Sequence, residues 1–156
     1  MEISARLEGL DRLIDAVRKA PAAVREVMDV AVLEAGEIIA EEGRSRHRYQ
    51  TRSGALDRSI AVRQAGPGAA SVFLDPLVAK YGPMLHAGTR AHLILPKNRK
   101  MLRWTNGNGF RFAREVHHPG TKPDQFLYEA ASRKRGEVVN RLQQGVQDAI
   151  EEAGLA

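Results

Sequence analysis

A β-hairpin is predicted by residues 60–74, which read IAVRQAGPGAASVFL. Apolar residues stand at both ends of this stretch, with Ile60 and Val62 before the turn and Val72-Phe73-Leu74 after it. Such β-branched and aromatic residues are typical of strands. Between them, Gly66-Pro67-Gly68 favours a sharp reversal of the chain. We therefore expect two antiparallel strands near the middle of the chain.

Further short elements follow this hairpin. Residues 81–87 predict one or two helical turns that end at Gly88, because glycine readily adopts the left-handed conformation in which chains leave helices. Three more strand candidates are Leu93–Leu95, Met101–Trp104 and Phe110–Val116. The last two are joined by Thr105-Asn106-Gly107-Asn108-Gly109, which contains Asn-Gly, a strong signal for a hairpin turn.

Helices are predicted on both sides of the strands. Residues 1–43 show helical spacing before and after Pro21, which suits the first turn of a second helix because proline has no N–H to leave unpaired. The prolines in residues 117–123 favour an extended chain, and a C-terminal helix then begins near Asp124, a candidate N-cap. Its apolar face consists of Leu127, Ala131, Val138, Leu142, Val146 and Ile150.

The order of these elements predicts an α+β fold. We expect two N-terminal helices, then a central, mainly antiparallel sheet of about four to five strands with a short helix, and then a long C-terminal helix packed on the sheet. The 156 residues form one domain in this interpretation, with a basic, flexible loop over about residues 44–54.

Charge is strongly segregated along the chain. The net charge is +5, but residues 44–63 carry six Arg against Asp57, and residues 90–122 carry eight Lys or Arg against Glu115. These two segments hold local charges of +5 and +7, which leaves −7 for the remainder. A chain with separate acidic and basic parts can be complementary to copies of itself.

The residues offer little material for catalysis or for a cofactor. There is no Cys, and the cluster of His86, His92, His117 and His118 has neither helical metal-ligand spacing nor nearby carboxylates except Glu115. Ser53 and Ser59 lack the context of a nucleophile elbow, and Gly107 and Gly109 lack the Lys-Ser/Thr pair of a phosphate loop. We therefore expect no enzyme, no catalytic or metal-binding residues and no cofactor. No leader or membrane span is apparent, so we expect a cytoplasmic protein or part of an assembly made there.

The basic centre leaves nucleic-acid binding as an alternative. Lys97-Asn98-Arg99-Lys100 resembles clusters that contact phosphates. Trp104, Phe110 and Phe112 alternate with Arg103 and Arg111, however, as expected for a half-buried hairpin, so we expect the aromatic rings in the core. A contact between the basic segment and acidic helices of a neighbouring subunit is the favoured interpretation.

An ordered set of short motifs is more specific than any of these features. It consists of Thr51, Gly54 and Leu56 with Ser59-Ile60; Tyr81-Gly82-Pro83; His86-Ala87-Gly88-Thr89-Arg90; His92, Ile94 and Pro96; Leu102-Arg103-Trp104; Val116; His118-Pro119-Gly120-Thr121-Lys122-Pro123; and Phe126 with Ala130. In order and spacing, over roughly residues 5–150, the set resembles the small tail-completion or head-tail joining proteins of long-tailed bacteriophages.

This resemblance implies a structural protein of the virion neck or the top of the tail, present in the host cytoplasm before assembly. It implies a homo-oligomeric ring, expected to be a hexamer, through which phage DNA passes, with head-closure or connector proteins, the tail terminator and the tail tube as further partners and no membrane partner. The alternatives are a tail-terminator ring or a DNA-binding packaging accessory; a hydrolase or metalloenzyme is the least supported.

Two groups of residues follow from this interpretation. Candidates for contact with other subunits or with DNA are Arg44, Arg46, Arg48, Arg90, Lys97, Arg99, Lys100 and Arg103. The motif residues expected to form the scaffold are Gly54, Tyr81, Gly88, Thr89, Pro119, Gly120, Thr121 and Phe126. Gly88 is expected to have a positive φ, and Phe126 and Leu127 to anchor the last helix on the strands.

Overall fold

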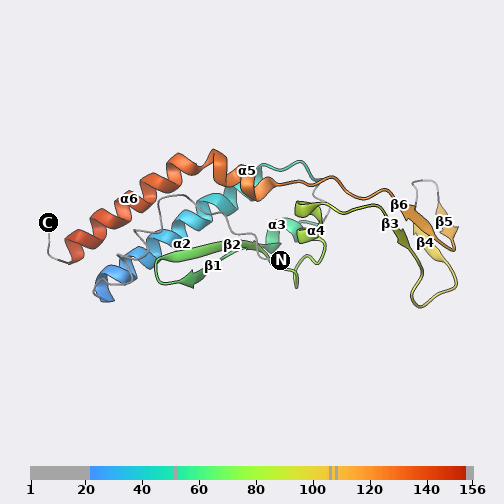
Figure 1. Ribbon diagram of the computed structural model, residues 1–156, viewed down its shortest axis with the longest axis horizontal. Coiled ribbons are helices and arrows are strands. Elements are labelled where there is room, and N and C mark those ends of the chain that lie inside the picture. The colour runs from blue at the N-terminus through green and yellow to red at the C-terminus, as the bar shows by residue number, and fades with distance from the viewer. Residues whose placement is uncertain (1–21, 51–52, 106, 108, 154–156) are drawn as a thin grey trace.

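The computed structural model describes residues 22–50, 53–105, 107 and 109–153, and it shows an elongated molecule with a helical body and a projecting arm (Figure 1). In the body, helix α2 (Ala22–Ser45) lies between helix α6 (Arg135–Glu152) and the hairpin of strands β1 (Ile60–Gly66) and β2 (Ala69–Leu74). The arm carries strands β3 (His92–Ile94), β4 (Leu102–Thr105), β5 (Phe110–Ala113) and β6 (Val116–His118). The predicted α+β class is confirmed.

Helix α2 is described from Ala22 onward, so the predicted place of Pro21 in its first turn lies outside the described residues. Met28, Ala31 and Ala35 are buried at helical spacing, because one face of α2 packs on the rest of the body. The helix predicted before Pro21 lies outside the described residues. Arg44, which the sequence analysis assigns to a loop, stands instead in the last turn of α2, where a cation is favoured by the helix dipole.

The hairpin predicted over residues 60–74 is confirmed. β1 and β2 pair antiparallel, with Ile60 opposite Leu74 and Val62 opposite Val72. Helix α2 lies very close to this hairpin, since a Cβ added to Gly36 would stand 2.6 Å from Cγ1 of Val62. A short helix that the sequence pattern does not predict, α3 (Ala55–Ser59), leads into β1.

The predicted C-terminal helix is divided at Lys134 into α5 (Phe126–Arg133) and α6. Phe126 and Leu127 of α5 lie in one core cluster with Ile60 and Leu74, so the predicted packing of this helix on the strands is confirmed. Helix α6 runs beside α2 in the opposite direction. Two further clusters join them, Val32 and Ala35 with Val138 and Leu142, and Met28 with Ala149.

The prediction that Asp124 is the N-cap of the last helix is wrong. Gln125 holds the cap position of α5 and its side chain makes no capping hydrogen bond. Asp124 is only 7% exposed, and its carboxylate accepts a hydrogen bond of 3.2 Å from the backbone N–H of Arg48. The carboxylate therefore satisfies a loop amide instead of the helix end.

The strands form three separate two-stranded antiparallel sheets, in place of the expected central sheet of four to five strands. β1 pairs with β2, β3 with β6, and β4 with β5. The predicted strand Phe110–Val116 is interrupted at residues 114–115, so its two parts pair with different partners. The arm's strands therefore never reach the edges of the β1–β2 hairpin, and they extend away from the body (Figure 1).

Among the described residues, no helix has the length and apolar character needed to cross a bilayer.

Candidate functional site

The base of the arm is a crossing of two chain segments that both belong to the quoted motifs. The predicted helix of residues 81–87 is confirmed as α4 (Gly82–Ala87), and it ends at Gly88 with φ of 75°. The next residue, Thr89, pairs with Thr121 through backbone N–H to O hydrogen bonds of 2.9 and 3.0 Å. The Thr89 hydroxyl accepts a further hydrogen bond of 3.0 Å from the Thr121 N–H. Residues 32 positions apart are thus fixed together where the arm leaves the body.

Both glycines at this crossing are required by close backbone contacts. A Cβ on Gly88 would lie 2.8 Å from the Thr121 carbonyl oxygen and 2.9 Å from the Pro123 nitrogen. Gly120 has φ of 91°, and a Cβ there would collide with the Thr89 carbonyl oxygen. Only glycine fits a positive φ and so little space at once. The expected positive φ of Gly88 is therefore confirmed.

The crossing is tied to the core on its body side. The backbone N–H of Asp124 donates to the Leu85 carbonyl oxygen at 3.1 Å, and Phe126, two residues after Asp124, is fully buried. The Phe126 ring meets His86 edge-on with 5.2 Å between centroids, and Tyr49 with 5.1 Å. Burial lowers the pKa of His86, because the charged imidazolium would lose its hydration there.

The remaining scaffold residues serve separate parts of the body and arm. Gly54, with φ of 66°, precedes α3, and the exposed Tyr81 precedes α4. Pro119 lies exposed between β6 and the crossing. Of the predicted scaffold, the structure therefore brings together Gly88, Thr89, Gly120 and Thr121 at the arm base, with Phe126 in the adjoining core.

The stem of the arm is the short β3–β6 sheet, in which two of the four clustered histidines face each other. His92 is paired with His118, and their rings stack with 5.0 Å between centroids. His118 Nδ1 accepts a 3.0 Å hydrogen bond from the Gly120 N–H, and His92 Nδ1 lies 2.9 Å from the Arg90 carbonyl oxygen. Within the described part of the chain, no three His, Cys, Asp or Glu side chains are placed to share a metal ion.

The tip of the arm exposes the aromatic side chains that the sequence analysis places in the core, so that prediction is wrong. Trp104 is 43% exposed, and Phe110 and Phe112 are each 58% exposed. The alternation along β4 and β5 does put residues on two faces, but no second layer of the body covers either face. None of the described residues from 87 to 123 is buried. Two-stranded sheets without such a layer are marginally stable in water.

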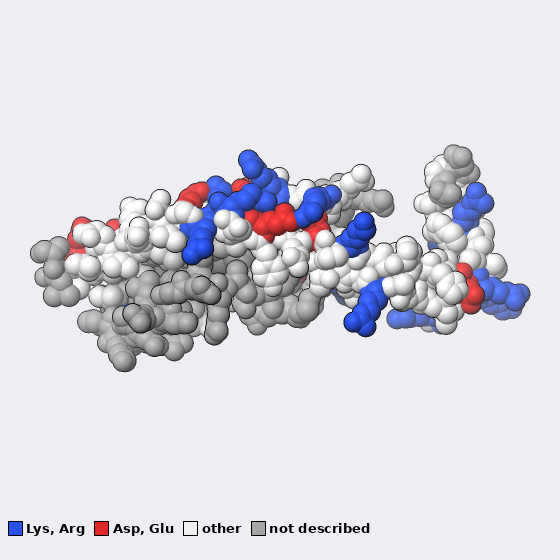
Figure 2. All heavy atoms as spheres, turned by 45° about the horizontal axis from the view of Figure 1, so that its top comes forward, with Lys and Arg blue, Asp and Glu red and all other residues white. Residues whose placement is uncertain are grey.

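The arm is also the most basic part of the surface. Its exposed cations are Arg90, Lys97, Arg99, Lys100, Arg103, Arg111, Arg114 and Lys122. None of these eight forms an ion pair with another residue that the structure describes. In Figure 2 blue side chains stand along the arm at the right with little red among them, as expected because Glu115 is the single acid of residues 90–122. The Arg103 guanidinium lies over the Phe110 ring, 4.3 Å from its centroid.

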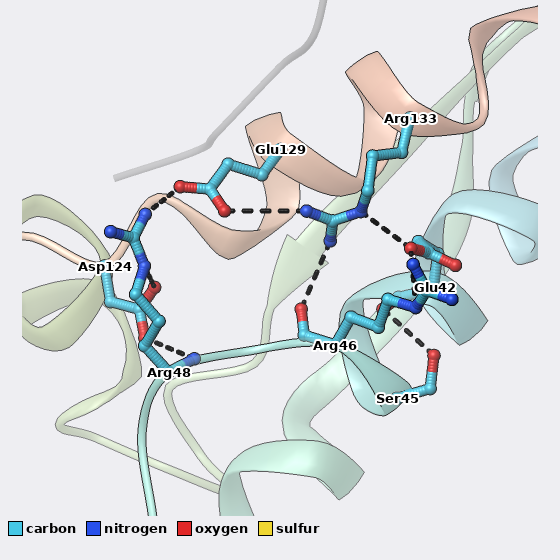
Figure 3. A network of polar contacts seen from close by, with 7 residues as sticks. All are labelled: Glu42, Ser45, Arg46, Arg48, Asp124, Glu129 and Arg133. Atoms are coloured by element: carbon cyan, nitrogen blue, oxygen red, sulfur yellow. Dashed lines mark hydrogen bonds and ion pairs between the residues drawn. The ribbon is translucent and has the colours of Figure 1, made fainter.

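The basic residues of the 44–54 segment behave differently, because they are bound within the chain. Arg44 donates to the Ile60 carbonyl oxygen at 2.8 Å and pairs with Glu37 and Glu41. Arg48 pairs with Asp124 and Glu129, which anchors its loop to α5 (Figure 3). The described part of this segment is thus held against the body.

Arg133 pairs with Glu129 of the same network and connects it to Glu42 (Figure 3). The Arg133 Nε donates to Glu42 at 2.7 Å, and Arg46 pairs with Glu42 at 3.7 Å. The hydrogen bond from Arg133 lowers the pKa of Glu42, and the nearby charge of Arg46 acts in the same direction. Arg44, Arg46 and Arg48 are therefore engaged in ion pairs within the fold. The candidate contact residues on the arm form no such pairs and can bind a partner: Arg90, Lys97, Arg99, Lys100 and Arg103.

Sequence reasoning missed the anchoring roles of Tyr49, Glu42 and Asp124, since no local pattern reveals contacts with distant elements. It did find the arm's charge, because residues 90–122 hold a single acid.

The chain has no match among protein-family models, curated proteins or solved structures.

Proposed function

We propose that this protein is a structural component of a bacteriophage particle at the junction of head and tail, and that it acts by assembly and not by catalysis. In this proposal its copies form a ring, sixfold as the family resemblance implies, at the head-proximal end of the tail. Head-closure or connector proteins, the tail terminator and the tail tube are its neighbours, and phage DNA passes through the ring.

The observation that carries the proposal is the arm. It has no buried residue among those described from 87 to 123, yet the Gly88-Thr89 and Gly120-Thr121 crossing fixes its base to the core. An arm that is anchored but uncovered gains its stability from a partner. Protein interfaces are enriched in aromatic residues, Met and Arg, and Trp104, Phe110, Phe112, Met101 and Arg103 are all exposed here.

A DNA-binding accessory protein is the second candidate, and one observation favours it. The exposed rings of Phe110 and Phe112 share one face of the β4–β5 hairpin with Arg103, which is paired with Phe112, and such a face lets bases stack while cations contact phosphates. Arg103 already covers one face of the Phe110 ring, however, which leaves that face closed to a base. The assembly function therefore remains the better-supported proposal.

Replacing Lys97, Arg99 and Lys100 together with Ala separates the two functions. We expect a soluble, folded variant, because these exposed side chains contribute nothing to the three core clusters. For an assembly protein, the expected result is fewer joined heads and tails on complementation, and at most weak, sequence-independent DNA binding by the parent. The matched control replaces three exposed cations of the body, Arg58, Lys80 and Arg135, and should join particles normally.

The DNA-binding alternative predicts a different result for the parent protein and for the arm variant. A DNA-binding protein would bind DNA tightly and selectively at physiological salt, and the arm variant would lose this affinity. Its salt dependence would become shallower by up to about 0.9 per lost phosphate contact. That result, with particle joining unaffected, would replace the assembly proposal with the DNA-binding one.

A further inference from the structure

The two ends of the elongated molecule have opposite charge. The arm lies at one end, and the opposite end is formed by the start of α2 and the end of α6, which run side by side in opposite directions (Figure 1). We call residues 22–33 and 143–152 the acidic end. The acidic end contains one basic residue, Arg25, and five acidic residues, which gives a net charge of −4. The acidic residues are Glu26, Asp29, Asp148, Glu151 and Glu152. Residues 90–122 of the arm hold +7.

The acidic end also exposes apolar side chains. Val30 on α2 is 52% exposed and Ile150 on α6 is 37% exposed. Glu26, Glu151 and Glu152 are exposed as well, and within the described ranges none of them forms an ion pair. This surface thus combines apolar groups with carboxylates that form no ion pair with a described residue, while the arm combines aromatic rings with cations that form none either.

We propose that the arm of one copy docks on the acidic end of a second copy. The face of the β4–β5 hairpin that carries Trp104, with Arg111 opposite it, would cover Val30 and Ile150. The arm's Lys and Arg side chains would face the carboxylates of α2 and α6. Because the two surfaces lie at opposite ends, one molecule cannot bring its own pair together. The contact is heterologous, and repeated head-to-tail contacts of this kind build closed rings or open filaments.

This inference deepens the proposed function, on which it rests for the closed ring, because it names the surface that joins neighbouring subunits. A second copy is the partner that accounts for both ends of the molecule, since the acidic end carries the negative charge that complements the basic arm. A nucleic acid would neutralise the arm but would leave the acidic end without a partner.

The chain contains a built-in probe for this contact. Trp104 is its single Trp, and it lies half exposed on β4. If the arm docks on a second copy, raising the protein concentration at about 50 mM salt should shift the Trp104 emission to shorter wavelength as the ring leaves water. Raising the salt to about 500 mM should reverse the shift, because exposed charges are then screened.

Charge reversal identifies the docking surface. Glu26→Lys, Glu151→Lys and Glu152→Lys together should abolish the emission shift. As a control, Glu37→Gln, Glu41→Gln and Glu137→Gln remove three exposed carboxylates elsewhere without placing a cation beside Arg44 or Lys134, and they should leave the shift intact. Adding an arm-reversed chain, with Lys97, Arg99 and Lys100 each changed to Glu, to the end-reversed chain should restore association, which a folding defect in either variant would not do.

Disulfide cross-linking gives a second measurement, because the chain has no Cys of its own. Thr105→Cys places a thiol at the arm tip, and Gln147→Cys places one on the exposed side of α6. Mixed and oxidised, the two single variants should form a disulfide dimer with each other in preference to either variant alone. Pairing of Thr105→Cys with Ser132→Cys on α5 is the control and should give no excess dimer.

Three outcomes would overturn this inference: no emission shift at any concentration, a shift that the end-reversed variant retains, or a shift that appears only on adding duplex DNA. Failure of the proposed function is distinct, because it is judged by whether the protein is present in particles. An end-reversed variant that enters particle necks normally would reject the docking contact and leave the proposed function standing.

Discussion

Gly120 illustrates how single residues position the arm. Its φ of 91° and its contact with the Thr89 carbonyl oxygen leave no room for a side chain. We predict that Gly120→Ala weakens the Thr89–Thr121 pairing by about 2 kcal/mol, because a left-handed backbone strains any L-residue and the Cβ collides as well. Hydrogen exchange of the Thr89 and Thr121 amides should accelerate by roughly 30-fold.

Gly136 provides the matched control for this substitution. It lies in the first turn of α6, with open space where a Cβ would stand. Gly136→Ala should leave the exchange of both threonine amides unchanged and stabilise the body by about 0.5 kcal/mol, since alanine favours the helix. Equal exchange rates in the Gly120→Ala and Gly136→Ala proteins would contradict the role assigned to the crossing.

His86 makes stability depend on pH. Its pKa lies below the ordinary 6.5 because burial disfavours the charged ring, with Asp124 opposing this in part. The unfolded chain therefore binds a proton more readily than the folded one, so the free energy of unfolding should fall as the pH drops below about 6.5. His86→Gln should lose less stability than the parent between about pH 7.5 and about pH 5.5, measured by urea unfolding.

The exposed His117 is the control for that measurement. Its side chain is 83% exposed, so His117→Gln should keep the pH dependence of the parent. A parent whose stability is flat across this pH interval would show that His86 does not titrate as its burial implies.

At the scale of the elements, the ion-pair network between α2 and α5 holds the C-terminal end of α2 in place. Arg133 donates to Glu42, which is buried to 8% exposure. Arg133→Ala leaves that carboxylate with only the longer contact to Arg46, so we predict a clear fall in melting temperature. Arg135→Ala, two residues on and exposed, should change the melting temperature by less than about 2 °C. Equal effects of the two substitutions would contradict this account of the network.

The arm should be removable without unfolding the body, because no arm residue belongs to the three core clusters. Replacing residues 96–114 with Asn-Gly would close β3 and β6 by a two-residue turn, since Ile94 and Val116 are already paired. We expect a melting temperature within a few degrees of the parent and complete loss of self-association. A molten or unfolded product by circular dichroism would show that the arm supports the body.

The sequence predicts these elements better than it predicts their surroundings. The β1–β2 hairpin, the β4–β5 hairpin and α4 ending at Gly88 all follow from local signals of turn and propensity, and the structure contains each of them. Local spacing does not reveal the break at Lys134 or the use of Asp124 by a loop amide. Those outcomes depend on contacts between distant segments.

The exposure of Trp104, Phe110 and Phe112 shows the same limit for the candidate site. Alternation with Arg103 and Arg111 assigns residues to two faces of a hairpin, but it does not say whether anything covers those faces. The segregation of charge was the better guide, because the segment with eight cations and one acid is the one that projects from the body.

At the scale of the whole molecule, the exposed aromatic side chains of the arm are the feature that favours binding to a partner. Each half-exposed aromatic ring that becomes buried removes roughly 100 Å² of apolar surface from water, worth about 2.5 kcal/mol. Trp104 lies on one face of the β4–β5 hairpin and Phe110 and Phe112 on the other. Burial of either face, together with charge complementarity, works against the entropic cost of association. A molecule with a basic arm at one end and acidic helices at the other is suited to joining copies in series.

The most direct test is a cryo-electron microscopy reconstruction of particles made by the genome that encodes this chain, with mass spectrometry of the same particles. The account predicts a ring at the neck or the top of the tail, into which the α2–α6 body fits, with the arm of each subunit on the acidic end of the next. Complete, DNA-filled particles whose neck and tail contain no copy of this protein would contradict it.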